Sequence, residues 1–239
     1  MGLGSLSIGV ACYNDAQTIE DVVMRAAETA GSVAARFRVL VVDDGSSDDS
    51  AARVRVLADR HAWLEARFHP ANLGFGATFR ELYSYAECEF NAILPGDGQI
   101  PPAEIAEMAA AMKDADVVLG VREKRQDSVR RRANSSVYNR VISVVAGEPI
   151  AEVNSIAISR TSLVRTFSLR SRSAFIHAEF LLRCIEAGGR VRHVPIRHEP
   201  RRHGAGAGGR LSVIVPTVAE LAAYVLRRRR AAPVPRTAP

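Results

Sequence analysis

The stretch FRVLVVDDGSSDDS, residues 37–50, joins a continuous apolar run to a cluster of acidic and hydroxyl side chains. The run over 37–44 is typical of a strand buried on both faces, because a half-exposed strand alternates apolar and polar residues. The segment 46–61 predicts a helix with acids in its first turn, where the helix dipole favours negative charge. A buried strand that leads into a helix is the unit of a parallel α/β sheet.

The rest of the first half repeats this unit. Short apolar runs predict further strands over 6–12, 64–69, 90–95 and 115–121. Apolar residues at helical spacing predict a helix that Asn14 or Asp15 can cap, and two more over 76–88 and 102–113. We therefore expect an α/β fold, with one Rossmann-like domain, a mostly parallel central sheet and helices on both faces.

The second half is less regular. Its pattern predicts a helix over 128–146, a strand over 155–159, a helix over 177–188, a strand over 190–196 and a mobile glycine loop over 204–209. The apolar segment 211–226 contains Pro216 and Glu220. It is shorter than the roughly 20 unbroken apolar residues that a spanning helix needs, so we interpret it as an amphipathic helix. Four arginines, 227–230, follow it.

These patterns predict one domain followed by a short extension. The domain covers 1–210, with a nucleotide-binding half over 1–121 and an acceptor half over 122–210. An amphipathic basic helix over 211–230 and a flexible tail over 231–239 follow. Three widely separated cysteines make no disulfide framework, and no signal peptide precedes the first strand. We therefore expect a cytoplasmic protein.

The net charge of +6 is unevenly distributed. Arginines cluster at 121–132, 197–204 and 227–230. Such clusters suit phosphates, anionic membrane surfaces or nucleic acid, and a solvated surface is the alternative. Aromatic residues, which stack on bases, make up only 6% of the chain. Together with the acidic strand ends described next, this disfavours nucleic acid as a partner.

Polar residues follow the predicted strands where ligands of open parallel sheets bind. They are Tyr13, Asn14 and Asp15 after the first strand, Asp43 and Asp44 after the second, Gly74 after the third, and Asp97 and Gln99 after the fourth. No G-x-G-x-x-G follows the first strand, and no phosphate-binding G-x-x-x-x-G-K-[ST] occurs. Carboxylates can accept hydrogen bonds from a base or ribose, and Asp97 with Gln99 offers oxygens to Mg²⁺ or Mn²⁺. Arg122 and Arg131 would clamp a second phosphate.

Several motifs resemble, in order, those of family 2 glycosyltransferases of the GT-A fold, nearest to the dolichyl- and polyprenyl-phosphate sugar synthases. They are SIGVACYND, VLVVDDGSSDDS, NLGFGATF, LPGDGQIPP, GVREKRQDSVRRRANSSVYNR and HAEFLLRCIEAGGRVRHVPIRHEPRRHG, within residues 5–205. The resemblance implies that Tyr13, Asn14, Asp15, Asp43 and Asp44 hold the nucleotide. It also implies that Asp97 ligates the metal with Gln99, while Pro95 stands where the family has another aspartate.

The same resemblance assigns an acceptor side. It implies that Arg122, Arg131, Ser135 and Asn139 hold an acceptor phosphate, and that Arg201, three residues before Gly204, closes over the diphosphate. Two departures concern this side: Gly206 stands where the family has a serine, and NSI replaces G-F-R before the sixth strand.

The resemblance implies an inverting transfer from a UDP-, GDP- or dTDP-sugar by in-line displacement. A polyprenyl phosphate acceptor is already anionic and needs no base, whereas a hydroxyl acceptor, as in natural-product or polysaccharide assembly, does. Glu179 is the candidate base, or an acid placed at a helix start by the dipole. The basic helix would either contact the inner face of the cell membrane peripherally or pack on the domain.

Overall fold

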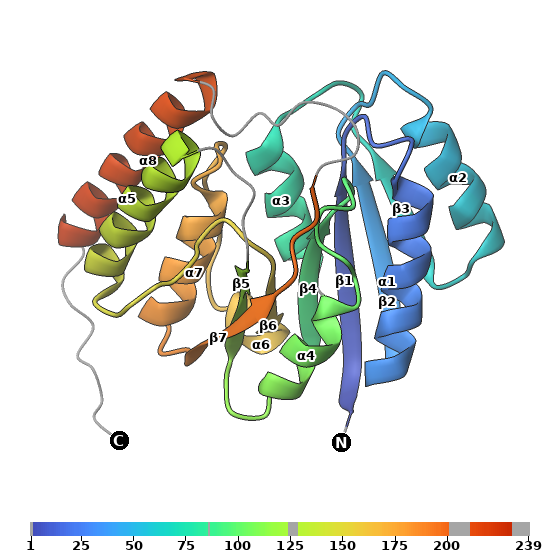
Figure 1. The fold of residues 1–239 in the computed structure, drawn as a ribbon, viewed down its shortest axis with the longest axis horizontal. Helices are drawn as coiled ribbons and strands as arrows, with labels where there is room; N and C mark the ends of the chain where they lie inside the picture. The colour runs from blue at the N-terminus through green and yellow to red at the C-terminus, as the bar shows by residue number, and fades with distance from the viewer. Residues whose placement is uncertain (1, 86, 124–128, 201–210, 231–239) are drawn as a thin grey trace.

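In the computed structural model, which describes residues 2–85, 87–123, 129–200 and 211–230, a seven-stranded sheet forms the centre of the molecule (Figure 1). The strands are β1 (Leu3–Cys12), β2 (Ala34–Asp43), β3 (Leu64–Phe68), β4 (Phe90–Pro95), β5 (Val117–Arg122), β6 (Ala157–Arg160) and β7 (Val191–Ile196). Their order is β3-β2-β1-β4-β6-β5-β7. Only β6 runs antiparallel to its neighbours, so the predicted mostly parallel sheet is confirmed.

Helices cover both faces of the sheet. The elements are α1 (Ile19–Val33), α2 (Ser50–Arg60), α3 (Phe75–Ser84), α4 (Glu104–Ala111), α5 (Val129–Ala146), α6 (Thr161–Val164), α7 (Ile176–Glu186) and α8 (Leu211–Arg230). Along β2, Val39 and Val41 join a core with α1, α2 and α4, while Leu40 and Val42 join a second core with α3, α5, α7 and α8. Alternate residues of a strand point to opposite faces, which explains why this run is apolar throughout.

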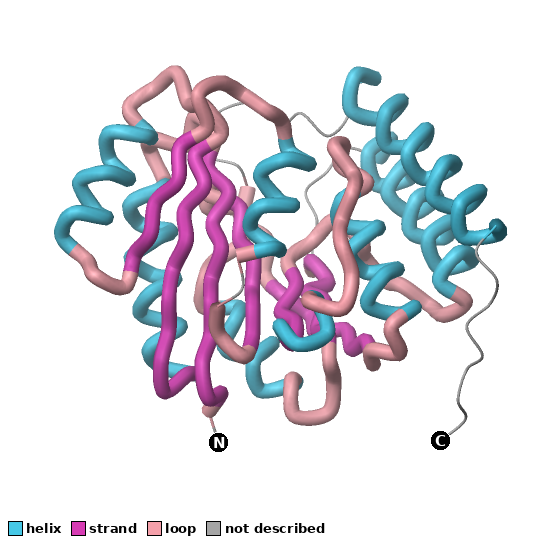
Figure 2. Tube along the Cα trace, turned by 180° about the vertical axis from the view of Figure 1, so that it is seen from behind, coloured by secondary structure: helices cyan, strands magenta, loops and turns pink. Residues whose placement is uncertain are grey.

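The last helix lies along α5, at the end of the molecule opposite α2 (Figures 1 and 2). Its buried residues Thr217, Leu221 and Tyr224 recur at helical spacing. Helix α8 continues through Pro216 as far as Arg230, four residues beyond the predicted apolar segment. The amphipathic C-terminal helix is thus confirmed. Among the described residues, no helix has both the length and the apolar character to cross a membrane.

The first helix begins later than predicted. Asn14 and Asp15 were the expected caps, but the helix begins at Ile19 after Thr18. The side chains of Asn14 and Asp15 are engaged elsewhere, because the Asn14 Oδ1 accepts from Ser47 N and the Asp15 Oδ2 accepts from Tyr13 N. The glycine loop 204–209 and the tail 231–239 lie outside the described residues.

Candidate active site

The candidate site lies where the strand order reverses. β1 is central, with Cys12 paired to Asp43 of β2 on one side and Ala11 paired to Pro95 of β4 on the other. Adjacent strands lie about 4.8 Å apart, so the two flanking strand ends are separated by about 10 Å. Ligands of open α/β sheets bind at this type of switch point, beyond the carboxyl ends of the strands. The topology therefore brings the predicted acidic residues to one edge.

The loops after β1 and β2 hold each other in place. Asn14 has a positive φ of 55°, and its backbone N–H donates to Ser46 Oγ over 2.9 Å. Its side-chain oxygen accepts from the backbone N–H of Ser47 over 2.8 Å. Asp43 is buried and accepts from both the backbone N–H and the hydroxyl of Ser46. Asn14 and Asp43 thus position these loops, and the ring of Tyr13 remains 47% exposed beside them.

The local electrostatic potential at this edge is negative. Burial raises the pKa of the Cys12 thiol far above its usual range, and the charges of Asp15 and Asp43 raise it further. The loop after β4 is also close, because a Cβ placed on Gly96 would lie 3.1 Å from Asp15 Oδ2 and 2.8 Å from Ala11 O. Only glycine permits this approach without displacing the β1 loop.

Asp97 and Gln99 occupy the turn after β4. The backbone N–H of Gln99 donates to Asp97 Oδ1 over 3.0 Å, and Gly98 between them has a φ of 70°. The segment after β7 crosses this turn, since the backbone N–H of Glu199 donates to Gln99 O over 2.7 Å. Arg197 anchors the same segment by an ion pair of 2.6 Å with the buried Glu104.

The donor atoms of this turn fit a hard divalent cation. A carboxylate and a side-chain amide oxygen are ligands that Mg²⁺ and Mn²⁺ accept, and substrate phosphates with water complete such a shell. Among the described residues, no cluster of three or more His, Cys, Asp or Glu side chains could hold a metal alone. Asp97 and Gln99 are the side-chain oxygen donors that this turn offers to such an ion.

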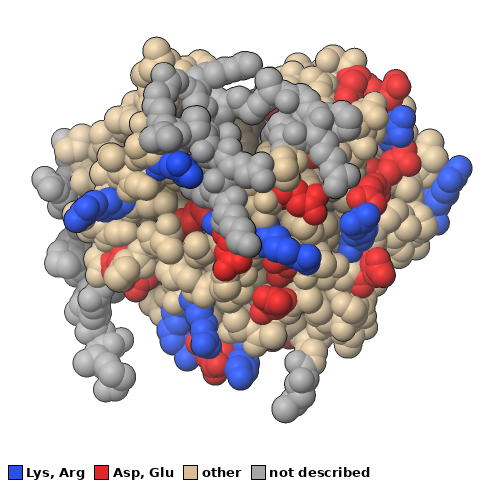
Figure 3. All heavy atoms as spheres, viewed as in Figure 1, with Lys and Arg blue, Asp and Glu red and all other residues tan. Residues whose placement is uncertain are grey.

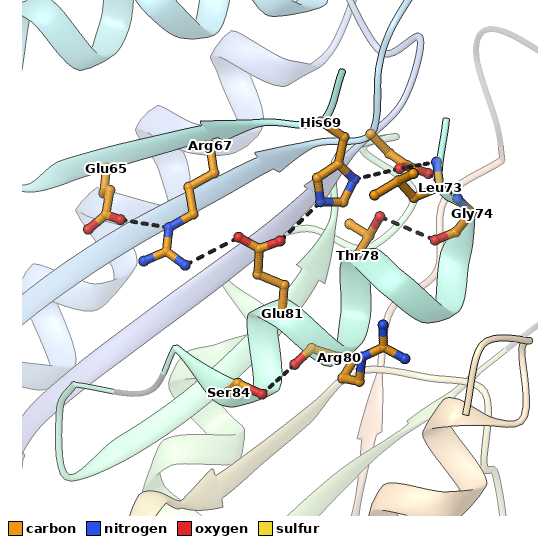
Figure 4. Close-up of polar contacts among 10 residues, drawn as sticks. Glu65, Arg67, His69, Leu73, Gly74, Thr78, Arg80, Glu81 and Ser84 are labelled. Carbon is orange, nitrogen blue, oxygen red and sulfur yellow. Dashed lines mark hydrogen bonds and ion pairs between the residues drawn. The ribbon is translucent and has the colours of Figure 1, made fainter. Parts of the chain in front are cut away.

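Asp44 contacts the next loop. This buried carboxylate accepts from the backbone N–H groups of Leu73 and Gly74 over 2.8 and 2.9 Å, and from His69 Nδ1 over 2.7 Å (Figure 4). His69 also contacts Glu81 of α3. His69 and Glu81 were not predicted from the sequence, because they belong to no motif and the residue after β3 meets α3 only in the folded protein.

Arg122 ends β5 in an ion pair that is largely removed from water. Its backbone N–H and its Nε each donate to Glu152 over 2.8 Å, and its Nη2 contacts the same carboxylate. The charge of Arg122 also reaches α7, because burial and then this guanidinium lower the pKa of His177 to about 3. Glu152 was not predicted, since it lies thirty residues from Arg122 in an irregular segment.

The described acceptor-side residues other than Arg122 lie on α5. Asn139 of α5 donates to Ala151 O over 2.9 Å and accepts from Val153 N over 3.2 Å, so it holds the segment that carries Glu152. Ser135 is partly exposed one turn earlier on the same helix. The side chain of Arg131, and all of Arg201 and Gly204, lie outside the described part of the chain.

Glu179 is buried near the start of α7. Its Oε2 accepts from the backbone N–H groups of Arg170 and Ser171 over 2.9 and 2.6 Å. This carboxylate therefore holds the segment that precedes α7.

Acidic and basic side chains are interspersed over the described residues of the face in Figure 3. Several arginines of the described residues form ion pairs, among them Arg190 with Asp116 and Arg192 with Asp114, each at 3.2 Å. These surface arginines thus serve local charge pairing.

The sheet and its oxygen-rich strand ends define a ligand-binding α/β protein. Residues 7–178 match the model of glycosyl transferase family 2, so the chain belongs to this family. The predicted family is confirmed.

Curated relatives support a finer comparison. The chain is 31% identical to an undecaprenyl-phosphate 4-deoxy-4-formamido-L-arabinose transferase of Pseudomonas savastanoi pv. phaseolicola, over 83% of this chain and 59% of that protein. It is 28% identical to the transferase of the same name from Edwardsiella ictaluri, over 87% of this chain and 64% of that protein. The chain thus spans slightly less than two thirds of the length of these relatives.

Solved structures share the fold. Glucosyl-3-phosphoglycerate synthase from Mycobacterium tuberculosis, in complex with Mn²⁺, UDP and glucosyl-3-phosphoglycerate, has a TM-score of 0.68 at 12% identity, covering 94% of this chain and 79% of that chain. A mannosyltransferase from Pyrobaculum calidifontis with GDP-mannose and Mn²⁺ has a TM-score of 0.65 at 18% identity, covering 91% and 64%. These likenesses agree with the predicted GT-A fold.

Proposed function

We propose that this protein transfers a sugar from a nucleoside diphosphate sugar to a polyprenyl phosphate. The observation that carries the proposal is the meeting of two acidic strand ends, Asp43 of β2 and the Asp97 turn after β4, on either side of β1. The relatives named undecaprenyl-phosphate sugar transferases support the choice of acceptor.

The donor would occupy the edge formed by β1, β2 and β4. Tyr13 offers an exposed ring for a base, and Asp15 offers oxygens to the base and ribose. Asn14 and Asp43 would hold the loops that line the nucleotide, with Asp44 and Gly74 beside them. UDP, GDP and dTDP are the candidate nucleotides, and the solved neighbours with UDP and GDP-mannose support the first two. A Mg²⁺ or Mn²⁺ ion, when bound, would neutralise charge on the leaving diphosphate.

The reaction would be a direct displacement with inversion. An oxygen of the acceptor phosphate forms a bond to the anomeric carbon, while the bond from that carbon to the diphosphate oxygen breaks. The nucleoside diphosphate leaves with the electron pair, and no proton has to be removed from the acceptor. The chain would orient the acceptor phosphate through Arg122, Arg131, Ser135 and Asn139, and Arg201 would close over the diphosphate.

A hydroxyl acceptor would require a base in contact with it. Glu179 is the carboxylate considered for that role, yet both of its described bonds fix the backbone of residues 170 and 171. This position supports a structural part for Glu179 and, with it, the phosphate acceptor.

We also propose peripheral contact with a membrane. Val137 and Val144 of α5 are 65% and 79% exposed, and Leu211 and Val215 of α8 are 76% and 62% exposed. The two helices lie side by side, and Arg228 of α8 contacts Val145 O of α5 (Figures 1 and 2). An exposed apolar face with arginines near one end suits the surface of an anionic bilayer, where a polyprenyl phosphate resides.

A thermal-shift panel tests the donor assignment. Wild-type protein is mixed with UDP-, GDP- or dTDP-sugars, with and without Mn²⁺, beside Asp97→Ala and a control, Asp59→Ala, on the exposed face of α2. We expect one nucleotide sugar to raise Tm in a metal-dependent manner in the wild type and the control but not in Asp97→Ala. A shift that persists in Asp97→Ala would overturn the metal assignment, and no shift with any donor would overturn the donor site.

A further inference from the structure

One chain of hydrogen bonds links the outer edge of the sheet to the rim of the candidate donor site. It runs from Glu65 to Arg67, then to Glu81, His69 and Asp44 (Figure 4). The chain ends at the backbone N–H groups that Asp44 binds, those of the loop before α3.

Asp44 is fully engaged by the protein. Three donors reach its two oxygens, and a carboxylate has about four acceptor positions in all. It is also buried, at 4% exposure. These contacts leave little of Asp44 for a nucleotide, so its influence on the donor is exerted through Leu73 and Gly74. The adjacent loops are closely packed there, because a Cβ on Gly45 would lie 2.4 Å from the backbone of Ala71.

His69 sits between two carboxylates. Its Nδ1 lies 2.7 Å from Asp44 Oδ1 and its Nε2 lies 3.0 Å from Glu81 Oε2, and its side chain is only 10% exposed. A neutral imidazole carries one N–H and can donate to one of these partners, whereas the imidazolium donates to both. Protonation of His69 therefore completes the chain.

The surrounding charges favour that protonated form. Burial alone would lower the pKa of His69, but hydrogen bonds to Asp44 and Glu81 and their charges raise it above its usual value. Arg67 contacts Glu81 over 3.2 Å, so its positive charge offsets part of the attraction that Glu81 exerts on protonated His69. Arg80 and Arg165 are the other cations nearby. They line a cavity of about 460 Å³ between α3 and residues 164–169, into which His69 and Glu81 also open. The imidazole can exchange protons with solvent through this cavity.

We propose that His69, held by Glu81, is a positioning residue for the donor site, which fixes Asp44 and through it the backbone amides of Leu73 and Gly74. The proposal rests on the proposed function, because it takes this loop to border the nucleotide. If so, nucleotide affinity depends on the protonation of His69, which does not itself contact the nucleotide.

The experiment compares wild type, His69→Gln, His69→Leu and a control, His61→Gln. His61 is partly buried and stacks on Trp63 before β3, at the opposite end of that strand. Titration calorimetry with UDP and with GDP in Mn²⁺, between about pH 6 and pH 9, spans the ordinary histidine range and values above it. Hydrogen exchange of the peptide covering residues 70–75 is measured without nucleotide.

We expect the nucleotide affinity of the wild type to fall about tenfold as the pH rises, because His69 loses one charged hydrogen bond when it deprotonates. His69→Gln keeps one donor and should bind with little pH dependence, His69→Leu should bind weakly throughout, and His61→Gln should follow the wild type. The protection factors of residues 70–75, which correct for the intrinsic rise of amide exchange with pH, should be lower in His69→Leu and in wild type at high pH.

Unchanged exchange in His69→Leu, or a wild-type pH profile retained in His69→Gln, would overturn the positioning role while leaving the donor site intact. If neither of these nucleotides binds the wild type at any pH, and dTDP does not bind it either, the donor site fails and the proposal with it. In that case, hydrogen exchange of residues 70–75 still tests whether His69 holds the loop before α3.

Discussion

Arg122 and Glu152 form a two-sided contact, in which the backbone N–H and the guanidinium of one residue both donate to the carboxylate of the other. Their side chains are 11% and 4% exposed, so the pair is largely removed from water. The end of β5 is thereby fixed to an irregular segment that Asn139 holds against α5. Any acceptor phosphate bound by Arg122 would meet a guanidinium that is already oriented.

Removing one partner of this pair should destabilise the fold. For Glu152→Ala we expect a loss of about 3–5 kcal/mol in the free energy of unfolding, because a buried guanidinium loses its counter-charge. The control is Asp21→Ala, which breaks an exposed pair with Arg25 and should cost less than about 1 kcal/mol. Urea unfolding measures both. Equal effects would contradict the buried character of the Arg122 pair.

Asp97→Asn should impair transfer more than folding. The amide keeps the size of the side chain and removes its charge, so we expect the rate with Mn²⁺ to fall by about a hundredfold or more. Transfer of labelled sugar to undecaprenyl phosphate is the measurement, with Asp59→Asn as the exposed control. Full activity of Asp97→Asn would refute its assignment as metal ligand.

Glu179→Gln separates the two classes of acceptor. A glutamine oxygen can still accept from Arg170 N and Ser171 N, so the segment before α7 should keep its place. We expect transfer to a lipid phosphate to remain within about threefold of wild type, because an anionic acceptor needs no base. Complete loss of transfer with unchanged Tm would instead give Glu179 a part in the reaction and contradict its structural role.

The exposed valines of α5 and α8 should govern membrane contact. Val144→Asp and Val215→Asp should each weaken binding to vesicles containing anionic lipid by about tenfold, since a buried valine side chain contributes roughly 1.5 kcal/mol. Val56→Asp, at a similarly exposed apolar position on α2, serves as the control. Vesicle sedimentation measures the partition. Equal binding by all three variants would reject this face as the contact surface.

Glu220 should attach α8 to the domain in a pH-dependent manner. It accepts from Arg172 N over 3.0 Å and from Ser173 Oγ over 2.6 Å. Burial would raise its pKa, but hydrogen bonds from Ser171, Ser173 and the backbone lower it below the usual 4.5. A carboxyl group whose pKa is lower in the folded protein than in the unfolded chain stabilises the fold at any pH above its unfolded-state pKa. This contribution is lost as the pH falls through its folded-state pKa.

Glu220→Gln should therefore cost about 1–3 kcal/mol at neutral pH and little in strong acid. Thermal unfolding from neutral pH to below pH 4.5 tests this, with Glu107→Gln, on exposed surface of α4, as the control. A difference between wild type and Glu220→Gln that is the same at every pH would contradict the ionised contact.

The order and type of most elements could be predicted because burial on both faces leaves a continuous apolar run, as in Val39–Val42. The short helix α6 was not predicted, since four residues give no periodicity. The predicted start of α1 was too early, because Asn and Asp are common helix N-caps. In the structure, the side chain of Asn14 instead contacts the loop after β2, and that of Asp15 contacts its own turn.

The sequence by itself determined the α/β class, the family and the set of polar residues at the strand ends, because these depend on local pattern and on neighbours along the chain. Tertiary structure alone decided which partners those residues have: Glu152 beside Arg122, His69 beside Asp44, and loop amides around Glu179. Such pairs join residues far apart in sequence or in irregular segments. Their contacts follow from how helices pack on the sheet, which no local spacing encodes.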